Sequence, residues 1–207
     1  LKAAFSKAVV WNYLSDNPLK KIKYTKVHKS NTVFISKREL NLILDKTTNQ
    51  NLKNIFTVAF YTGMRLSEIL NMKSFWIDTQ QNIITLKNSV DFTTKSKKER
   101  IIPIHSRIAS IVIKPNSKTD DFIFNCKSDI KFNEDYVSKQ FKKALRAAEL
   151  NDEIHFHSLR HSFASNLVQR GVNLYVVKEL LGHEDIKTTQ IYSHLTQSSL
   201  SNAVQLL

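Results

Sequence analysis

Long apolar runs, cysteines and glycines are all scarce in this sequence of 207 residues. No apolar run approaches the roughly 20 residues that span a bilayer, and no signal peptide opens the chain, so we expect a cytoplasmic protein that does not enter the membrane. The single cysteine, Cys126, excludes an intrachain disulfide and suits a reducing compartment. None of the three glycines, Gly63, Gly171 and Gly182, belongs to a phosphate loop of the GxxxxGKS type, so no nucleotide cofactor is predicted.

Acidic residues are few relative to basic ones. The chain has 31 Lys and Arg residues against 18 Asp and Glu residues, which gives a net charge of +13 at pH 7. A field of this sign attracts polyanions, and DNA carries about one charge per 1.7 Å of its axis. Nucleic acid is therefore the first predicted partner, and an acidic membrane surface is the second.

Hydrophobic periodicity predicts an α+β chain that is mainly α-helical. Helices are expected over 1–14, 51–61, 66–72, 106–112 and 156–170, with a short helical piece over 188–192. Further helices should follow the capping residues Ser36, Asn133 and Asn173, and Gly171 and Gly182 should end the last two long helices. The residues expected to be buried are Leu52, Ile55, Phe56, Ala59 and Phe60 on the helix over 51–61, and Val176, Val177, Leu180 and Leu181 on the helix after Asn173. Within 77–104 the period shifts toward two, which indicates a small three-stranded antiparallel sheet with strands near 83–85, 90–94 and 100–104.

The segment 157–164 (HSLRHSFA) is the most informative stretch of the chain. On a helix, His157, Arg160 and His161 lie at i, i+3 and i+4, so an imidazole and a guanidinium face a common partner. We expect an anion there, because the guanidinium fork matches phosphate oxygens and imidazoles can donate to the same group. Tyr192, nine residues after His183, has a hydroxyl that could attack phosphorus once the phosphate charge is masked.

A second motif lies far upstream, at 62–68 (TGMRLSE). Gly63 is placed to end one helix in a left-handed conformation and Leu66 to begin the next, so Arg65 should lie on a tight corner. An isolated arginine here would be interpreted as a surface residue paired with Glu68. Glu68 is expected to support the local helix or the arginine rather than to act as a catalytic acid.

From about Ser36 to the C-terminus the chain resembles the tyrosine recombinase (phage integrase) family. Separate motifs occur in the family's order, namely the 62–68 segment, His157, Arg160, His183 and Tyr192. The resemblance implies an integrase-type catalytic domain over 31–207. It also implies that 1–30 is the end of a truncated N-terminal core-binding domain plus a basic linker.

The resemblance further implies that the protein cuts and rejoins double-stranded DNA through a 3′-phosphotyrosyl intermediate, as a site-specific recombinase or integrase of a mobile element. Arg65, Arg160 and His183 would bind the phosphate, Tyr192 would attack it, and His157 would accept or orient the tyrosine proton. No metal, nucleotide or other cofactor is implied. The expected assembly is a homotetramer on DNA, with a monomer in the free form.

The resemblance also places a general acid in the turn between the second and third strands. The pattern KxxKxR over 95–100 assigns that role to Lys95, which would protonate the departing 5′ oxygen. Ser96 stands where the family has glycine, and Lys97 and Lys98 compete for the role. A basic hairpin tip that only touches the DNA backbone is the alternative.

Other interpretations of the same residues differ in class. Five histidines, perhaps with Cys126, could bind a metal, but His157 and His161 enclose an arginine rather than the glutamate of an HExxH site. A non-catalytic DNA-binding module would explain the charge but not the ordered motifs. A type IB topoisomerase-like strand transferase would share the chemistry, whereas the motifs favour a recombinase. The histidines concerned are His155, His157, His161, His183 and His194.

Three further segments are predicted to make contacts beyond the catalytic residues. The lysine-rich stretch 19–31 is either a solvated linker or a strap along DNA phosphates. The basic face of the helix after Asn133 is either solvated or lies in a DNA groove. An apolar stripe near the C-terminus is expected to dock on a neighbouring protomer, as is common in the family. The residues of the face and the stripe are Lys139, Lys142, Lys143 and Arg146, and Leu200, Val204 and Leu207.

Overall fold

The computed structural model describes residues 1–23, 33–88, 92–93, 99–114, 118–127 and 130–196. By its internal contacts the chain divides into two compact units, Leu1–Asn31 and Thr32–Leu207. No helix in the described ranges is long and apolar enough to cross a lipid bilayer. The assignment of 1–30 to the end of a core-binding domain stays a prediction.

The first unit contains one short helix, α1 (Lys2–Val10). The helix predicted over 1–14 is too long, because Asn12 adopts a left-handed backbone conformation with φ of 61° and the helix cannot continue through it. The Asn17 side-chain amide donates to the Lys2 carbonyl and the Ser6 hydroxyl, which ties the following turn back to α1. No residue of α1 is buried within the described structure.

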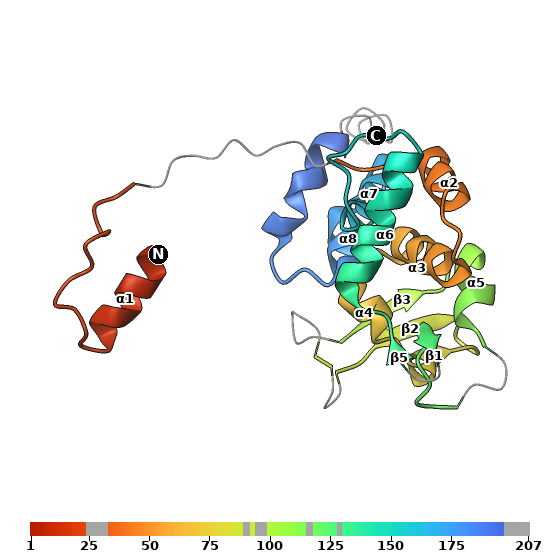
Figure 1. Ribbon diagram of the computed structural model, residues 1–207, viewed down its shortest axis with the longest axis horizontal. Coiled ribbons are helices and arrows are strands. Elements are labelled where there is room, and N and C mark those ends of the chain that lie inside the picture. Colours follow the sequence, from red (N-terminus) through yellow and green to blue (C-terminus); the bar gives the residue numbers. More distant parts are fainter. Residues whose placement is uncertain (24–32, 89–91, 94–98, 115–117, 128–129, 197–207) are drawn as a thin grey trace, which may run out of the picture. The chain divides into compact units, whose positions relative to one another are not determined.

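The second unit is mainly helical, as predicted. In Figure 1 its helices form the larger part of the unit and the three-stranded sheet lies at one edge of them. The helices are α2 (Lys37–Asp45), α3 (Gln50–Thr62), α4 (Leu66–Leu70), α5 (Ser106–Val112), α6 (Glu134–Ala147), α7 (Ser158–Gln169) and α8 (Leu174–Leu181). Short 3₁₀ segments are η1 (Ser74–Trp76), η2 (Ile186–Thr188) and η3 (Gln190–Thr196).

Side-chain caps begin the helices where the sequence predicts them. Ser36 forms the expected capping box at the start of α2: its hydroxyl accepts from the Glu39 N–H at 3.2 Å, and the Glu39 carboxylate accepts from the Ser36 N–H at 2.7 Å. Asn133 caps α6 by accepting from the N–H groups of Asp135 and Tyr136, and Asn173 caps α8 by accepting from the N–H of Tyr175. Each such cap contributes about 1 kcal/mol, so these helix starts are specified locally.

The sheet has the predicted antiparallel topology but not all of the predicted strands. Its strands are β1 (Ile77–Asp78), β2 (Ile83–Leu86) and β3 (Arg100–Pro103), in the order β1-β2-β3. The strand expected at 90–94 is wrong for its two described residues, Phe92 and Thr93, which lie outside any strand. Both edges of β2 are already paired with β1 and β3, and Phe92 packs its ring near that of Trp76 instead. A separate hairpin of β4 (Asn125–Lys127) and β5 (Ile130–Lys131) was not expected.

The core is built around α3, which contacts helices α2, α4, α5, α6 and α7. The residues predicted to be buried on α3 are buried, and the Phe56 ring packs edge-on against Phe141 of α6 with centroids 5.2 Å apart. A smaller cluster joins α7, α8 and η3 around Val168, Leu181 and Tyr192. Val176 was expected in this cluster but is 50% exposed, because the neighbouring Val177 is the residue of α8 that faces it.

Gly63 ends α3 in the left-handed conformation that the sequence predicts, with φ of 64°. A Cβ atom at this position would lie 2.5 Å from Phe163 Cδ1 and 2.9 Å from Leu181 Cδ2. Helices α7 and α8 therefore pack directly on the corner between α3 and α4, which leaves no room for a side chain.

We predict that Gly63→Ala destabilises the chain more than Gly171→Ala. Both substitutions force a left-handed alanine, at a cost of about 1–2 kcal/mol. Gly171 has φ of 83° but no atom within 4 Å of its added Cβ, so it is a matched control. At Gly63 the clash with Phe163 and Leu181 should add about 1–3 kcal/mol. Urea unfolding of the two variants measures the difference, and equal losses would show that the corner is not closely packed.

Candidate active site

Helix α7 supplies three of the side chains singled out by the sequence. It begins at Ser158, so His157 is its N-cap residue rather than an interior position of the helix predicted over 156–170. Arg160 and His161 follow within the first turns. The His157 and His161 rings lie edge-on with centroids 5.0 Å apart. Burial and the neighbouring charges of His161 and Arg160 lower the pKa of His157 to about 4, although part of its side chain stays exposed.

Arg160 is buried, with only 3% of its surface exposed. Its Nη1 donates to the Gly63 carbonyl and its Nη2 to the Leu181 carbonyl, both at 2.7 Å. Both acceptors lie at the C-terminal ends of helices, where unpaired carbonyls and the helix dipole provide negative potential. Burial and the charge of Arg65 lower the pKa of Arg160 to about 9, so the guanidinium remains charged at pH 7.

Arg65 lies on the corner that its motif predicts, as the N-cap residue of α4. Its backbone N–H and its Nη1 donate to the two oxygens of Glu68 at 2.8 and 2.9 Å. Arg100 of β3 donates to the same two oxygens at 2.9 and 2.7 Å, and its Nε donates to the Leu180 carbonyl at 3.0 Å. Glu68 therefore supports the corner, as expected, and it does so through two arginines rather than one.

The charge of Glu68 is retained although only 1% of the residue is exposed. Burial acts to raise the pKa of Glu68, but the hydrogen bonds and charges of Arg100 and Arg65 outweigh burial and lower the pKa below its ordinary value. The site thus contains one buried carboxylate among three guanidiniums, those of Arg65, Arg100 and Arg160. The surplus positive charge suits an incoming phosphate.

His183 follows Gly182, the left-handed residue that ends α8, as the sequence predicts. Its Nδ1 lies 2.8 Å from the hydroxyl of the buried Thr189. Burial, followed by the charges of Arg160 and Arg65, lowers the pKa of His183 to about 3. A neutral imidazole whose Nδ1 accepts from Thr189 has its proton on Nε2 and can donate it to an anion.

Tyr192 lies in η3 with only 1% of its surface exposed. Its hydroxyl is 2.6 Å from Nδ1 of His161. Burial raises the pKa of Tyr192 to about 12, and burial together with the charges of His155 and Arg160 lowers the pKa of His161 to about 4. The phenol is therefore protonated and the imidazole neutral at pH 7, and the histidine beside the phenol is His161 rather than His157.

The structure brings five of the six predicted catalytic residues together. Arg160 contacts the corner before Arg65 and the end of the helix before His183, and its neighbour His161 contacts Tyr192. Lys95, with its competitors Lys97 and Lys98, lies outside the described residues, as do Leu200, Val204 and Leu207. The catalytic role of each residue stays a prediction.

The structure also bears on the predicted basic face of α6 and on the metal-binding alternative. On α6, Lys142 and Arg146 form ion pairs with Asp152 at 3.3 and 2.8 Å, so part of the predicted basic face is already paired within the chain. Contact of this face with DNA stays a prediction. Among the described residues, no group of three or more His, Cys, Asp and Glu side chains is arranged to hold a metal ion.

Sequence reasoning missed two residues of the site. The sequence indicates Arg100 only as the last residue of the KxxKxR pattern, and His161 only as part of the helical motif. Buried and exposed residues alternate along β3, and this alternation could have indicated that Arg100 is buried. Arg100 pairs in the sheet with the buried Leu86, and a buried charge needs a buried partner. His161 had no such signal, since its contact with Tyr192 joins positions 31 residues apart.

We predict that Arg100→Ala destabilises the chain by about 3 kcal/mol, because it removes two of the four hydrogen bonds that compensate the buried Glu68 carboxylate. Arg146→Ala is the control: it removes an exposed arginine from the ion pair with Asp152 and should cost far less. Urea unfolding at pH 7 measures both, and similar losses would contradict a structural role for the buried pair.

The chain is similar to known proteins over most of its length. Residues 33–199 match the sequence model of the phage integrase family. The tyrosine recombinase XerD of Rickettsia prowazekii is 30% identical over 224 residues, which cover 99% of this chain and 72% of that protein. The catalytic domain of bacteriophage HP1 integrase is 31% identical, with a TM-score of 0.63 over 84% of this chain and 94% of that one. The Tn1549 transposon integrase, solved in complex with transposon right end DNA, shares the fold with a TM-score of 0.77 and 18% identity over 99% of this chain and 75% of that one. The chain therefore belongs to the phage integrase family of tyrosine recombinases, enzymes that cut and rejoin DNA.

Proposed function

We propose that this chain carries out site-specific recombination of double-stranded DNA through a 3′-phosphotyrosyl intermediate at Tyr192. The observation that carries the proposal is the position of Arg160 and His161. Arg160 is bonded to the corner that precedes Arg65 and to the end of the helix that precedes His183, while the next residue, His161, is bonded to the phenol of Tyr192. One turn of α7 thus joins a phosphate-binding group to a nucleophile.

Arg65, Arg160 and His183 bind the scissile phosphate in this proposal. A phosphodiester carries one negative charge, and attack by an oxygen adds a second in the pentavalent transition state. Donors placed around the nonbridging oxygens stabilise this added charge, and loss of one such donor typically costs about 10² to 10³ in rate. Three guanidiniums around the single Glu68 carboxylate supply the positive surplus that this step needs.

Tyr192 is the nucleophile, and its proton goes to an imidazole. The phenol oxygen forms a bond to phosphorus, the bond from phosphorus to the 5′ oxygen breaks, and the phenol proton passes to His161, which lies 2.6 Å away. His157, whose ring is next to that of His161, orients it or accepts the proton in turn. Because the covalent link conserves the phosphodiester energy, rejoining by a free 5′-hydroxyl needs no nucleotide or metal.

Lys95 provides the proton for the departing 5′ oxygen in this scheme. An ammonium group is well matched to an alkoxide leaving group, which is a strong base. Lys97 and Lys98 follow Lys95 closely in the sequence and are the competing candidates.

DNA is the partner in this proposal, and a homotetramer on DNA is the assembly. The net charge of +13 supports binding to a polyanion, and the Tn1549 integrase, which has the same fold, was solved with DNA bound. Residues 1–30 are proposed as the end of a core-binding domain followed by a linker whose lysines follow the DNA backbone. Target sequence and direction of recombination would be determined by contacts outside the catalytic residues.

Tyr192→Phe is expected to abolish the covalent protein–DNA adduct while DNA binding is retained, because phenylalanine keeps the ring but has no oxygen to attack phosphorus. The measurement is trapping on a suicide duplex nicked near the cleavage point, followed by denaturing electrophoresis. Tyr175→Phe is the matched control, since Tyr175 is 67% exposed on α8 and is not among the residues proposed to bind the phosphate or to transfer a proton. An adduct that survives in Tyr192→Phe would exclude Tyr192 as the nucleophile.

Lys95→Ala is expected to cleave normal DNA slowly but to recover on a substrate whose 5′-bridging oxygen is replaced by sulfur. A thiolate is a good leaving group and needs no general acid, so the sulfur substrate bypasses the missing proton donor. Lys97→Ala and Lys98→Ala, tested on both substrates, identify which lysine has this property. A Lys95→Ala variant that is equally slow with oxygen and sulfur would exclude Lys95 as the acid.

A further inference from the structure

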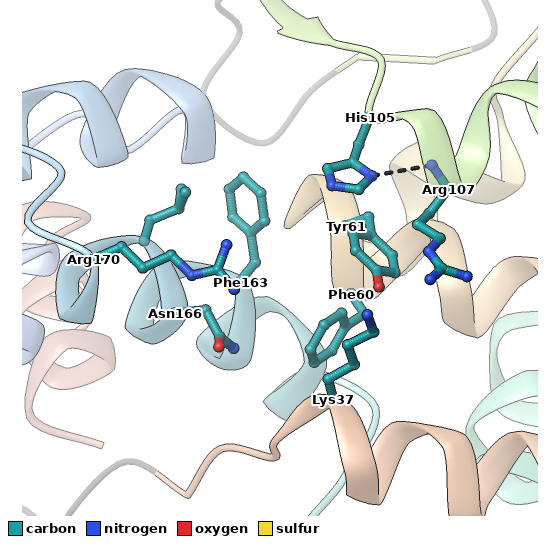
Figure 2. Close-up of a pocket in the computed structure, with 9 residues that line it drawn as sticks. Lys37, Phe60, Tyr61, His105, Arg107, Phe163, Asn166 and Arg170 are labelled. Carbon is teal, nitrogen blue, oxygen red and sulfur yellow. Dashed lines mark hydrogen bonds between the residues drawn. The ribbon is translucent and has the colours of Figure 1, made fainter.

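A cavity of about 240 Å³ lies between α2, α3, α5 and α7. Figure 2 shows its lining: Phe60 and Tyr61 from the end of α3, Phe163 and Asn166 from α7, and His105 from the start of α5. None of these residues belongs to the set proposed for catalysis.

The floor of the cavity is apolar and aromatic. Phe60 is only 6% exposed, and Phe163 and Leu167 are half-buried beside it. The Tyr61 and His105 rings lie together with centroids 4.6 Å apart and form one wall. A surface of this kind favours an apolar or aromatic group of a ligand.

The rim of the cavity is cationic. Lys37, Arg107 and Arg170 surround the opening in Figure 2, and all three are exposed. No Asp or Glu lines the cavity, and none of the three cations forms an ion pair with any carboxylate in the described part of the chain. The rim is therefore complementary to negative charge.

Two side chains of the cavity, Asn166 and Arg170, point away from His157 and His161, whereas Phe163 and Leu167 follow Arg160 by three and seven residues and lie on its side of α7. Asn166 is nine residues after His157, and Arg170 is nine residues after His161. Nine residues are two and a half turns of an α-helix, so each of these side chains points to the side of α7 opposite its histidine. Tyr192 contacts His161, and no residue proposed to bind the phosphate lines the cavity, so the cavity is a separate site from the one proposed for the phosphate.

The volume of the cavity limits the kind of ligand that it can bind. Pockets for drug-sized molecules and cofactors usually measure about 300–1,000 Å³, whereas this cavity suits one large side chain. An apolar centre with a charged, arginine-rich rim is the usual anatomy of a protein–protein contact with one dominant anchor residue. We propose that the cavity binds a partner protein through an acidic segment that inserts a single aromatic or branched aliphatic side chain.

The bound side chain would lie close to the catalytic corner. Its contact surface includes Phe163, whose ring packs so tightly on Gly63 that a Cβ there would be 2.5 Å away. The Gly63 carbonyl is in turn an acceptor of Arg160. The partner would thus touch the side chain that supports the phosphate-binding corner from behind.

The experiment is a selection of displayed random dodecapeptides on the wild-type chain. Selected peptides are then measured by fluorescence anisotropy against two variants of equal net charge. The cavity variant is Lys37→Glu/Arg107→Glu/Arg170→Glu. The control is Lys46→Glu/Lys139→Glu/Lys143→Glu, which reverses three cations that are also exposed and line no part of this cavity. Circular dichroism establishes that both variants are folded.

We expect the selected peptides to carry Asp or Glu around one aromatic or branched aliphatic residue. They should bind the control about as well as wild type and the cavity variant about tenfold more weakly, since each rim pair contributes at most about 1 kcal/mol. Replacing the anchor residue by serine should remove binding to all three proteins.

Several outcomes would overturn the proposal. Equal weakening in both variants would mean that acidic peptides bind only through the overall charge. Selection of no peptide, or of peptides without an anchor, would mean that the cavity is not a recognition site. A short DNA duplex could displace the selected peptides from wild type and bind the cavity variant more weakly than wild type. That result would assign the rim to nucleic acid. Self-association of wild type that only the cavity variant loses would assign the cavity to a second copy of the chain.

Discussion

The buried guanidinium of Arg160 is the group on which the arrangement of the site depends. Removing an ion from water costs several kcal/mol, and this cost is offset here by two short, charge-assisted hydrogen bonds to the Gly63 and Leu181 carbonyls. Each carbonyl ends a helix and has no partner within it. The same contacts that compensate the charge therefore also fix where α3 and α8 end, and with them the residues that follow, Arg65 and His183.

A second buried contact fixes the other half of the site. Glu68 accepts from Arg65 and Arg100, and Arg100 also donates to the Leu180 carbonyl, next to the Leu181 carbonyl that Arg160 uses. The end of α8 is thus held by two arginines from different parts of the chain. One carboxylate and several backbone dipoles compensate three guanidiniums, so the region keeps a net positive charge. A bound phosphate can neutralise this charge.

Tyr192, the proposed nucleophile, is held in the same compact region. Tyr192 belongs to the small core cluster with Val168 and Leu181, and its only described side-chain hydrogen bond is the one to His161. Burial raises the pKa of Tyr192 to about 12, so its hydroxyl is protonated at pH 7 although the neutral His161, the proposed proton acceptor, is already next to it. In the proposed reaction the phenol would lose its proton to His161 as its oxygen bonds to phosphorus, so no free phenolate is required beforehand.

Much of this could be predicted from the sequence because it is local. Capping residues such as Ser36 and Asn173, the apolar spacing of α3 and the left-handed glycines each depend on neighbours within a few positions. Long-range packing decided the rest. Phe92 lies outside the sheet because β2 was already paired on both edges, Val176 is exposed because Val177 faces the core, and Arg100 and His161 join the site through partners 32 and 31 residues away. Local preferences are encoded by adjacent residues, whereas the pairing of a buried charge depends on which distant segments the core brings together.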